Sequence, residues 1–500
     1  MLNTINPQNL LITDAQWMGL GPYLILTVGI LLSMLLATVA VSRESKLPLF
    51  LFSCLTIIAA GVWNGMYWVR EPIAVFGGAM QLDYFSSFFN ILLCGSTLLV
   101  FMSSYSYLEE GDIHYSEFYP ILLSSTLGMM LLASSAELIT LFVSLELMSL
   151  MVYVLVGLRR RNARSNEASV KYFVMGGVSA AIYLYGTALV YGALNTTKLA
   201  QISMLLSQDG ASVLSNPVLI AGVVFLIVGF MFKVAAFPFH LWAPDVYEGA
   251  PTNITSYMAT ALKAAVFASL IRVSMSFFGD QGVPLLGNMQ AVVHEVLWWL
   301  ALLTMVMGNF VALMQSNLKR LMAYSAIAHT GYLLVGLLAG PVVGYSGIVF
   351  YLVAYIAMNI GAFSLIALFA GKDDSALTLQ NLAGMGKRHP VLAAALTIFL
   401  LSLAGFPPTA GFVGKYYLFA GALEAGETLL VLLGVLTSAV SVYYYLRIVV
   451  LMYMTDANQG FSFKGSKIAY AAIAICVFLT LNYGLFPGAL LHAAKKAAIF

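Results

Sequence analysis

The stretch GFMFKVAAFPFHLW, residues 229–242, places Lys233 and then Pro238 at the end of one of the most apolar runs in the chain. Pro238 has no backbone N–H, and its ring clashes with the carbonyl group of residue 234, so a helix through this run cannot stay regular. We therefore predict a kink about one turn after Lys233. The carbonyl groups freed by this kink can then face a polar cavity.

The composition of the whole chain is that of a membrane protein. Of its 500 residues 61% are hydrophobic and 9% are charged, whereas soluble domains carry about 25% charged residues. Apolar runs of roughly 20 residues recur along the sequence, and each is long enough to cross the hydrocarbon layer as a helix. The alternating pattern of a membrane β-barrel is absent. The sequence thus excludes an ordinary water-soluble enzyme and predicts an all-α polytopic membrane protein.

Polar residues divide the chain into fourteen predicted transmembrane helices, and this even number places both termini on one side. The expected spans are 20–41, 47–69, 84–107, 117–135, 136–157, 168–193, 216–241, 252–275, 291–315, 319–340, 343–370, 390–424 (interrupted), 428–452 and 467–487.

The basic residues are distributed unequally among the predicted loops. The odd-numbered loops hold Arg43, Lys46, Arg159, Arg160, Arg161, Arg164, Lys171, Lys319, Arg320, Lys372, Lys387, Arg388, Lys464 and Lys467, and the even-numbered loops and the tail hold Arg70, Lys198, Arg272, Lys495 and Lys496. Loops rich in Lys and Arg stay in the cytoplasm. We therefore expect both termini on the non-cytoplasmic side.

Four basic residues remain inside the predicted spans: Lys233, Lys263, Lys415 and Arg447. Arg447 lies near the end of its span, where a long side chain can reach the interface. Glu146 lies about ten residues inside the fifth span. Each charge in the membrane interior costs ~2.5–3.5 kcal/mol, so Glu146 and the three lysines together cost on the order of ten kcal/mol. A stable fold does not by itself require charged residues at these positions.

Two interpretations of these charges are open. Glu146 and one lysine can form a structural ion pair, which is a poor source of stability because desolvation offsets the attraction. That leaves two lysines without an acidic partner, so we favour an ion pathway. Lysine suits a proton relay because a buried ammonium can release its proton, whereas arginine stays charged. His329, inside the tenth span, is either a further proton carrier or a packing residue.

A second helix break is predicted in LAGFPPTAGFVGKYYLF, residues 403–419, where Gly405, Pro407 and Pro408 interrupt the twelfth span before Lys415. Two interrupted segments in corresponding halves of a chain are typical of transporters built from inverted repeats. We therefore predict two inverted five-helix repeats with discontinuous helices 7 and 12. Within one membrane domain, residues 1–500, the expected units are an N-terminal part (1–116), repeat one (117–276), repeat two (290–452) and a last span (467–487).

No pattern in the sequence indicates a bound cofactor. Cys54, Cys94 and Cys476 lie far apart inside apolar runs, without the spacing of metal ligands. A glycine-rich phosphate loop and a dinucleotide-binding fingerprint are both missing. We therefore expect neither a metal nor a redox cofactor in this chain.

Four motifs carry a resemblance to a known family: KVAAFPFHLWAPDVYEGAPT (233–252), NLKRLMAYSAIAHTGYLLVG (317–336), RNARSNEASVKYFVMGG (161–177) and GFPPTAGFVGKYYLF (405–419). With them, nearly the whole chain resembles the proton-translocating antiporter-like subunits of respiratory complex I (NADH:quinone oxidoreductase) and of Mrp-type sodium/proton antiporters. Within this family it is most similar to the N-type subunits of bacterial complex I, since M-type subunits typically have Glu where this chain has Lys415. A ferredoxin-linked cyanobacterial or plastid counterpart is an alternative.

The resemblance implies a function and roles for individual residues. Glu146 and Lys233 would be an interacting pair, Lys263 a central relay and Lys415 the residue that controls exchange with the far side, while the position of His329 varies in the family. NADH, FMN, iron–sulfur clusters and quinone would be bound by partner subunits of this translocase. The implied partners are the other membrane-arm subunits (M, L, K, J, A and H types) and the lipid bilayer of the bacterial inner membrane, and no nucleic acid.

Three other classes of function are weighed against this one. An independent Mrp-type sodium/proton antiporter subunit would share the same charges. A solute transporter or channel would need a polar cluster beyond the titratable residues, and the sequence has none. A membrane scaffold would leave the buried lysines unexplained.

Overall fold

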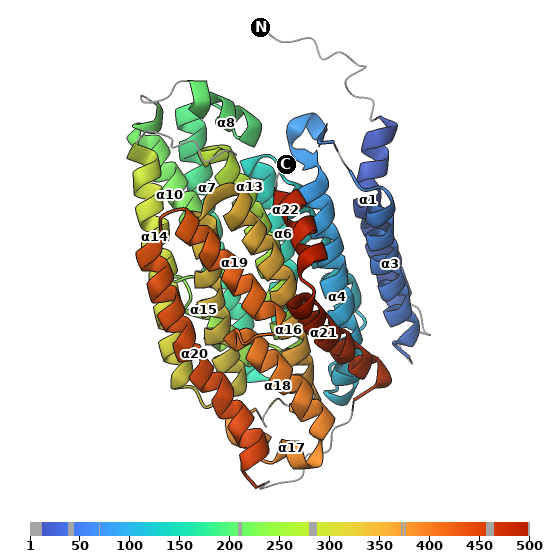
Figure 1. The fold of residues 1–500 in the computed structure, drawn as a ribbon. Coiled ribbons are helices and arrows are strands. Elements are labelled where there is room, and N and C mark those ends of the chain that lie inside the picture. The colour runs from blue at the N-terminus through green and yellow to red at the C-terminus, as the bar shows by residue number, and fades with distance from the viewer. Residues whose placement is uncertain are drawn as a thin grey trace.

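The computed structural model describes residues 13–38, 45–69, 71–208, 213–279, 288–371, 374, 377–456 and 465–498. These residues form a bundle of long helices (Figure 1). A short antiparallel hairpin, β1 (Ile73–Val75) and β2 (Met80–Leu82), encloses the 3-10 turn η2 (Phe76–Gly78). The helices of the first half are α1 (Asp14–Thr38), α3 (Leu47–Met66), α4 (Tyr84–Glu110), α5 (Phe118–Ser134), α6 (Leu138–Val156), α7 (Ala163–Leu194), α8 (Leu199–Gln208), α10 (Pro217–Lys233), α11 (Trp242–Gly249), α12 (Thr252–Tyr257), the π-helical turn η3 (Met258–Leu262) and α13 (Lys263–Phe278).

The second half of the chain is also helical. It contains α14 (Asn288–Leu313), α15 (Leu318–Leu338), the π-helical turn η4 (Gly340–Gly344), α16 (Tyr345–Phe369), the 3-10 turn η5 (Leu379–Leu382), α17 (Met385–Arg388), α18 (Pro390–Ala404), α19 (Ala410–Glu424), α20 (Thr428–Met454), α21 (Lys467–Leu485) and α22 (Gly488–Ala498).

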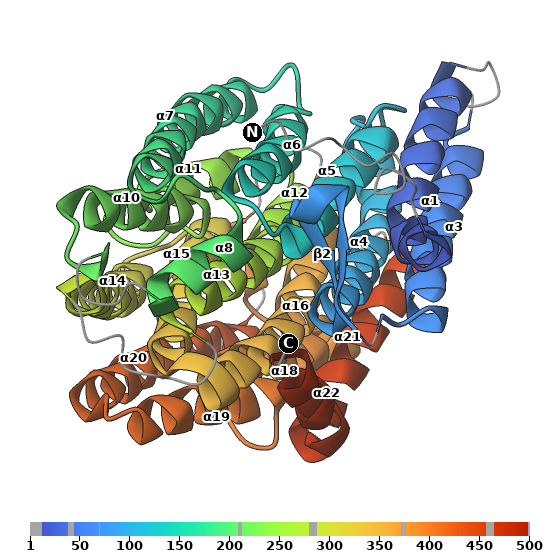
Figure 2. The ribbon, with the colours of Figure 1, turned by 90° about the horizontal axis from the view of Figure 1, so that it is seen from above.

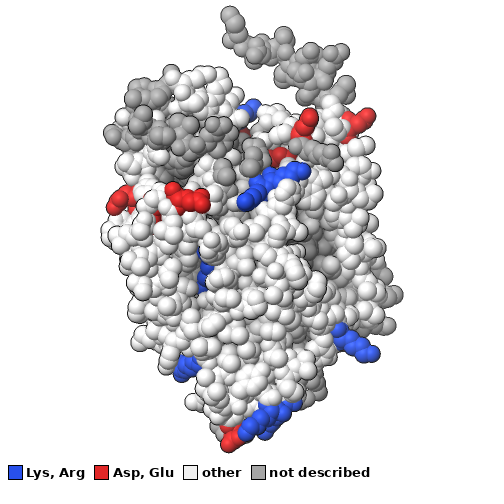
Figure 3. Space-filling view, viewed as in Figure 1, with Lys and Arg blue, Asp and Glu red and all other residues white. Residues whose placement is uncertain are grey.

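The predicted number of spans is confirmed. Among the described residues, eleven helices are long and apolar enough to cross a membrane, when α12 to α13 are counted as one, and the shorter apolar helices α5, α10 and α18 occupy the three remaining predicted spans. On the face shown in Figure 3, charged side chains gather toward the two ends and the band between them is nearly free of charge. The chain is an all-α multi-pass membrane protein.

Both predicted helix breaks are present, but the first begins earlier than the sequence predicts. α10 ends at Lys233 itself, and irregular backbone continues past Pro238 to the start of α11. The helix ends early because Ala235 adopts a left-handed φ of 57°, before the proline is reached. At the second break, between α18 and α19, Gly405 has a φ of 92°, which glycine adopts without strain, and Pro407–Pro408 follow.

The helices that carry Lys263 and His329 lie in the centre of the bundle. Seen from above in Figure 2, α1 and α3 form one edge and α14 and α20 form the opposite edge. α13, α15 and α16 lie between these edges and are the most buried of the spans. Lys263 at the start of α13 and His329 in α15 are therefore remote from lipid.

Two short backbone bridges occupy corresponding positions in the two halves. Glu137, directly before α6, pairs with Lys198, directly before α8, and Asn317, directly before α15, pairs with Thr378, directly before η5. In each case the segment that enters one spanning helix is tied to the segment that follows the next spanning helix. Figure 1 shows α8 and α17, which follow the two bridges, at opposite ends of the bundle.

Arg272, which the charge count assigns to a loop although the predicted span 252–275 contains it, lies in α13 and is almost fully buried. Its guanidinium donates to both carboxylate oxygens of Asp83, at 2.8 and 3.0 Å, and to the carbonyl oxygen of Ala133 at 3.1 Å. Lys171, also counted as a loop charge although the predicted span 168–193 contains it, lies in α7 and pairs with Asp245 of α11. Both loop assignments are wrong because an ion pair allows a charged residue to stay inside a helix bundle.

Asp374 joins four parts of the chain at one end of the bundle. Its carboxylate accepts hydrogen bonds from Tyr107 at the end of α4 (2.9 Å), Arg159 after α6 (3.0 Å), the Thr252 hydroxyl at the start of α12 (3.0 Å) and Lys319 at the start of α15 (3.1 Å). Arg159 and Lys319, counted as loop charges in the sequence, are thus buried ion-pair partners.

His114, in the connection between α4 and α5, makes stability depend on pH. Burial, and then the charge of Lys46, lower its pKa from 6.5 to about 4. Because the unfolded chain binds this proton more tightly, the stability that neutral His114 contributes is full above pH 6.5 and is lost as the pH falls toward 4. We expect His114→Gln to weaken the loss of thermal stability between about pH 7 and about pH 4.5. An unchanged pH dependence would contradict this role.

Candidate functional site: a line of buried lysines

Lys233 lies at the C-terminal end of α10 and pairs with Glu146 of α6. Its Nζ is 3.1 Å from Oε1 of Glu146, and it also donates to the hydroxyl oxygens of Ser149 (2.9 Å) and Tyr153 (3.3 Å). The lysine side chain is 2% exposed and the glutamate side chain is 19% exposed. The structure therefore brings together the two residues that the resemblance pairs, with the carboxylate nearer the outer surface of the chain.

The break after Lys233 connects this pair with Lys263. Because α10 ends at Lys233, the carbonyl oxygen of Val234 lies outside the helix, and it accepts a hydrogen bond from Oγ1 of Thr330 at 2.8 Å. The same Oγ1 accepts from Nζ of Lys263 at 2.9 Å, and the carbonyl oxygen of Ala326 is the second acceptor of this ammonium. One hydroxyl group thus bridges the broken helix and Lys263.

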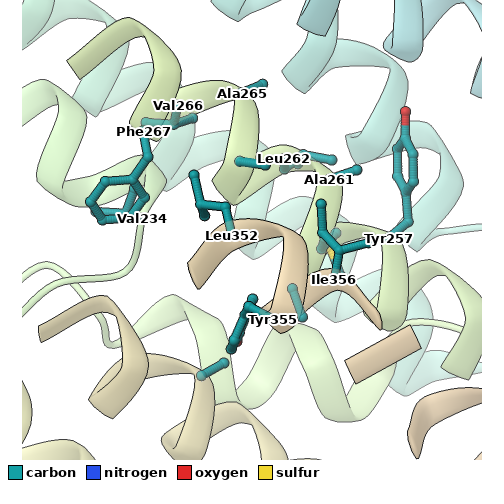
Figure 4. Close-up of a cluster of buried hydrophobic side chains, with 14 of the residues drawn as sticks. Val234, Tyr257, Ala261, Leu262, Ala265, Val266, Phe267, Leu352, Tyr355 and Ile356 are labelled. Carbon is teal, nitrogen blue, oxygen red and sulfur yellow. The ribbon is translucent and has the colours of Figure 1, made fainter. Parts of the chain in front are cut away.

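The orientation of Lys263 depends on the π-helical turn that precedes it. η3 ends at Leu262, directly before Lys263, and a π turn contains one residue more than an α turn, so it shifts the face on which later side chains lie. Figure 4 shows Leu262 in one buried cluster with Leu352, Tyr355 and Ile356 of α16. While this face packs against α16, Lys263 reaches α15.

His329 lies beside Thr330 in α15 and is buried among tyrosines. Its Nδ1 is hydrogen bonded to the hydroxyl of Tyr351, and its Nε2 is 3.2 Å from the hydroxyl of Tyr445, which also contacts Ser325. Both ring nitrogens therefore have hydroxyl partners. A chain of this kind can pass a proton through the imidazole ring, and it equally satisfies a histidine that is buried for packing, so the contacts fit both interpretations of His329.

Lys415 lies in α19, beyond the second helix break. Its Nζ donates to the carbonyl oxygen of Ala404, the last residue of α18, at 3.1 Å and to the hydroxyl oxygen of Ser438 at 2.9 Å. The same nitrogen is 4.8 Å from the ring centre of Tyr332, and that ring lies 5.5 Å from the ring of His329. α15 thus contacts Lys263 through Ala326 and Thr330 and Lys415 through Tyr332.

Among the described residues, neutral oxygens accept every hydrogen bond that Lys263 and Lys415 donate. Lys233, in contrast, donates a hydrogen bond to a carboxylate. The site therefore has one ion-paired lysine followed by two lysines whose hydrogen-bond acceptors are neutral.

Sequence reasoning missed the hydroxyl groups that connect these lysines. Thr330, Tyr351, Tyr445 and Ser438 are residue types common in buried helices, and the sequence alone does not show that they contact the lysines or His329. One signal was present in AIAHTGY, residues 326–332, because the spacing of Ala326, His329 and Thr330 places them on one helix face.

Comparison with known proteins shows the family to which the chain belongs. The sequence pattern of the family described as NADH:quinone oxidoreductase/Mrp antiporter, TM matches residues 135–441. The chain belongs to this family. The matched segment of this NADH:quinone oxidoreductase/Mrp antiporter family member contains all five candidate residues, from Glu146 to Lys415. The helices α1, α3 and α4 precede it.

Family members with similar sequence and structure are known from several bacteria. NADH-quinone oxidoreductase subunit N of Trichlorobacter lovleyi is 43% identical over 467 residues, which cover 93% of this chain and 94% of that protein. A chain of respiratory complex I from Thermus thermophilus, solved with bound aureothin, is 33% identical, with a TM-score of 0.79 and coverage of 94% and 98%. A chain of the Mrp complex from Dietzia is 20% identical with a TM-score of 0.82, covering 96% and 97%, so it shares the fold.

Proposed function

We propose that this chain is the N-type proton-translocating membrane-arm subunit of an NADH:quinone oxidoreductase, respiratory complex I. The proposal rests on a series of contacts between buried residues. They lead from Glu146 and Lys233 through Thr330 to Lys263, and from His329 and Tyr332 to Lys415. The named relatives and the matching complex I chain support it. NADH, FMN, iron–sulfur clusters and quinone belong to partner subunits, and the M-, L-, K-, J-, A- and H-type membrane subunits are the expected neighbours.

The pair at 146 and 233 controls the proton path in this proposal. Glu146 stabilises the ammonium of Lys233, because an opposite charge at 3.1 Å favours the protonated form. When Glu146 is neutralised or moves away, Lys233 loses that stabilisation and releases its proton. The proton then passes to Lys263 and on to Lys415, which exchanges it with the far side. Quinone reduction in partner subunits drives the change at Glu146.

Buried polar atoms in the interior of the bundle support a hydrated path. His240 Nδ1, Asn253 Oδ1, Ser256 Oγ and Tyr355 Oη are buried and have no hydrogen-bond partner among the described residues. The ring of Tyr355 lies 5.3 Å from the ring of His329. Buried polar groups of this kind bind ordered water in proteins, and water would carry protons between the fixed side chains.

The orientation of the chain in the bacterial inner membrane follows from its charges. The ends of α6 and α4 and the starts of α12 and α15 meet at Asp374, together with buried Arg159 and Lys319. We assign this basic end to the cytoplasm. α1 begins and α22 lies toward the other end (Figure 1), so both termini belong to the non-cytoplasmic side.

We further propose that residues 117–276 and 290–452 are inverted repeats within a single membrane domain, with 1–116 as an N-terminal part and 467–487 as a last span. The two bridges, Glu137 with Lys198 and Asn317 with Thr378, support this assignment because they stand at equivalent positions and opposite ends. Residue-by-residue superposition of the two ranges after inversion tests it.

Replacing Lys233 with alanine tests the proposed function. In the purified complex reconstituted into liposomes, we expect Lys233→Ala to lower sharply the number of protons pumped per NADH oxidised, because the carboxylate of Glu146 loses its switching partner. The complex should remain assembled. The measurement is acidification of the vesicle lumen at a matched electron-transfer rate.

Lys387→Ala is the matched control, since Lys387 pairs with Asp456 at the surface, where its side chain is 68% exposed. It should pump normally. Unchanged pumping per electron in Lys233→Ala would refute the role of Lys233. Purification with flavin and iron–sulfur proteins distinguishes a complex I subunit from an Mrp-type antiporter subunit, which would purify with membrane subunits alone.

Thr330→Val tests the hydroxyl bridge between Val234 and Lys263. Valine keeps the shape of threonine but removes a hydrogen bond to a charged group, worth about 1.5–3 kcal/mol, so we expect proton translocation to slow by about tenfold or more. Thr330→Ser keeps the hydroxyl and should retain most of the rate. Equal rates in the two variants would show that the bridge is only structural.

A further inference from the structure

An apolar groove lies apart from the line of lysines, between α4, α16, α21 and α22. It has a volume of about 440 Å³, and side chains such as Phe88 and Met102 of α4, Ile356 of α16 and Leu479 of α21 line it. Phe88 and Met102 are fourteen residues apart, which corresponds to ~21 Å along a helix. The groove therefore runs along the bundle over a distance longer than one leaflet of the hydrocarbon layer, ~15 Å.

One polar atom of the groove has no partner. Nε1 of Trp68 is buried and makes no hydrogen bond among the described residues, although Trp68 lines the groove. Buried N–H groups are nearly always hydrogen bonded in native proteins. An acceptor supplied by an occupant of the groove would satisfy this N–H.

Cationic side chains stand at the same end of the groove as Trp68. The Trp68 and Tyr84 rings lie 4.7 Å apart, and Nζ of Lys496 is 4.6 Å from the centre of the Tyr84 ring. Lys495 is adjacent in α22, the helix that also supplies Leu490 to the groove lining. Figure 3 shows the blue patch over α22. An occupant with an acceptor near Trp68 and a negative group near these lysines fits this end.

We propose that the groove binds one anionic phospholipid. One of its acyl chains lies along α4 between Phe88 and Met102, an oxygen of its ester or phosphate group accepts the hydrogen bond of Trp68, and Lys495 and Lys496 bind the anionic headgroup. Clusters of lysine near the membrane surface favour anionic lipids.

A polypeptide fits this groove less well than a lipid. An extended peptide would place unsatisfied backbone N–H and C=O groups against an apolar lining, which the hydrocarbon region does not tolerate. A lipid brings its polar atoms only at the end where Trp68 and the lysines lie.

Native mass spectrometry of the chain released from the purified complex tests the proposal. The complex is first reconstituted into nanodiscs of equal parts phosphatidylcholine and phosphatidylglycerol. We expect one retained phosphatidylglycerol on the unmodified chain. Gly95→Leu fills the groove without a clash, because a Cβ at Gly95 meets no atom within 4 Å, so the retained lipid should fall by about tenfold or more.

Three further variants make the result specific. Gly192→Leu, at a helical glycine of α7 with equally open space, is the matched control and should retain the lipid. Lys495→Gln with Lys496→Gln should remove the preference for phosphatidylglycerol over phosphatidylcholine, and Trp68→Phe should weaken retention. Equal retention of both lipids by the unmodified chain, undiminished lipid in Gly95→Leu, or a neighbouring subunit crosslinked to Gly95→Cys would overturn the proposal.

Discussion

Asp83→Asn is expected to destabilise the folded chain by about 3–5 kcal/mol, because it removes the carboxylate that neutralises a buried guanidinium. Arg272 stays protonated even when buried, and its guanidinium lies between α13 and the start of α4 with a side chain that is 4% exposed. Asparagine keeps an oxygen that can cap α4 through Ser86 N, as Asp83 does at 2.7 Å. The substitution therefore removes the charge and preserves the cap. The measurement is the midpoint of thermal unfolding of the detergent-solubilised chain.

Two comparisons isolate this effect. Asp456→Asn removes a carboxylate from a surface pair with Lys387, also at 2.8 Å, and should leave the midpoint unchanged because exposed ion pairs contribute little. Asp83→Asn combined with Arg272→Gln replaces the ion pair by two neutral amides and should recover part of the loss. A single variant as stable as the original chain would contradict the account of Arg272.

Lys263→Met is expected to stop proton translocation while the fold remains intact. Methionine fills similar space without a titratable group, and removing a positioned proton carrier costs on the order of 10²-fold or more in rate. The buried ammonium itself costs ~2.5–3.5 kcal/mol, so the folded chain should become no less stable. Proton pumping by the reconstituted complex measures the loss of translocation, and thermal unfolding of the same preparation measures the stability.

Lys263→Arg separates charge from proton release. Arginine keeps a positive charge near Ala326 and Thr330 but does not give up its proton at physiological pH. It should therefore be as inactive as methionine. Normal pumping in Lys263→Arg would mean that the position needs only a charge, and the relay would then have to run through other residues.

The sequence was sufficient for the spans and for the presence of both breaks. A bilayer forces each crossing to satisfy its own backbone hydrogen bonds, so length, apolarity and the positions of Lys and Arg carry most of the fold. The place of the first break could not be read in this way. Ala235 has a left-handed φ, and no property of an alanine in a sequence indicates that conformation.

The candidate site was predictable only in part. Four residues stand out because charge is rare inside apolar runs: Glu146, Lys233, Lys263 and Lys415. In the structure, the side chain of each makes a hydrogen bond to another helix. Arg272 was misjudged because its partner, Asp83, is 189 positions away in the chain. The groove beside Trp68 is likewise formed by helices distant in sequence, so its lining residues look like ordinary lipid-facing positions.

The π-helical turn Met258–Leu262 makes the number of residues before Lys263 as important as their identity. An α-helix advances by 3.6 residues per turn, so each residue corresponds to a rotation of about 100°. If the same residues formed regular α-helix instead, the extra residue would rotate the ammonium by about 100° away from α15, although every side chain of the relay was still present. A homologue without the π turn therefore keeps its lysine directed at α15 only if it also lacks one residue, so insertions and deletions here are as informative as substitutions.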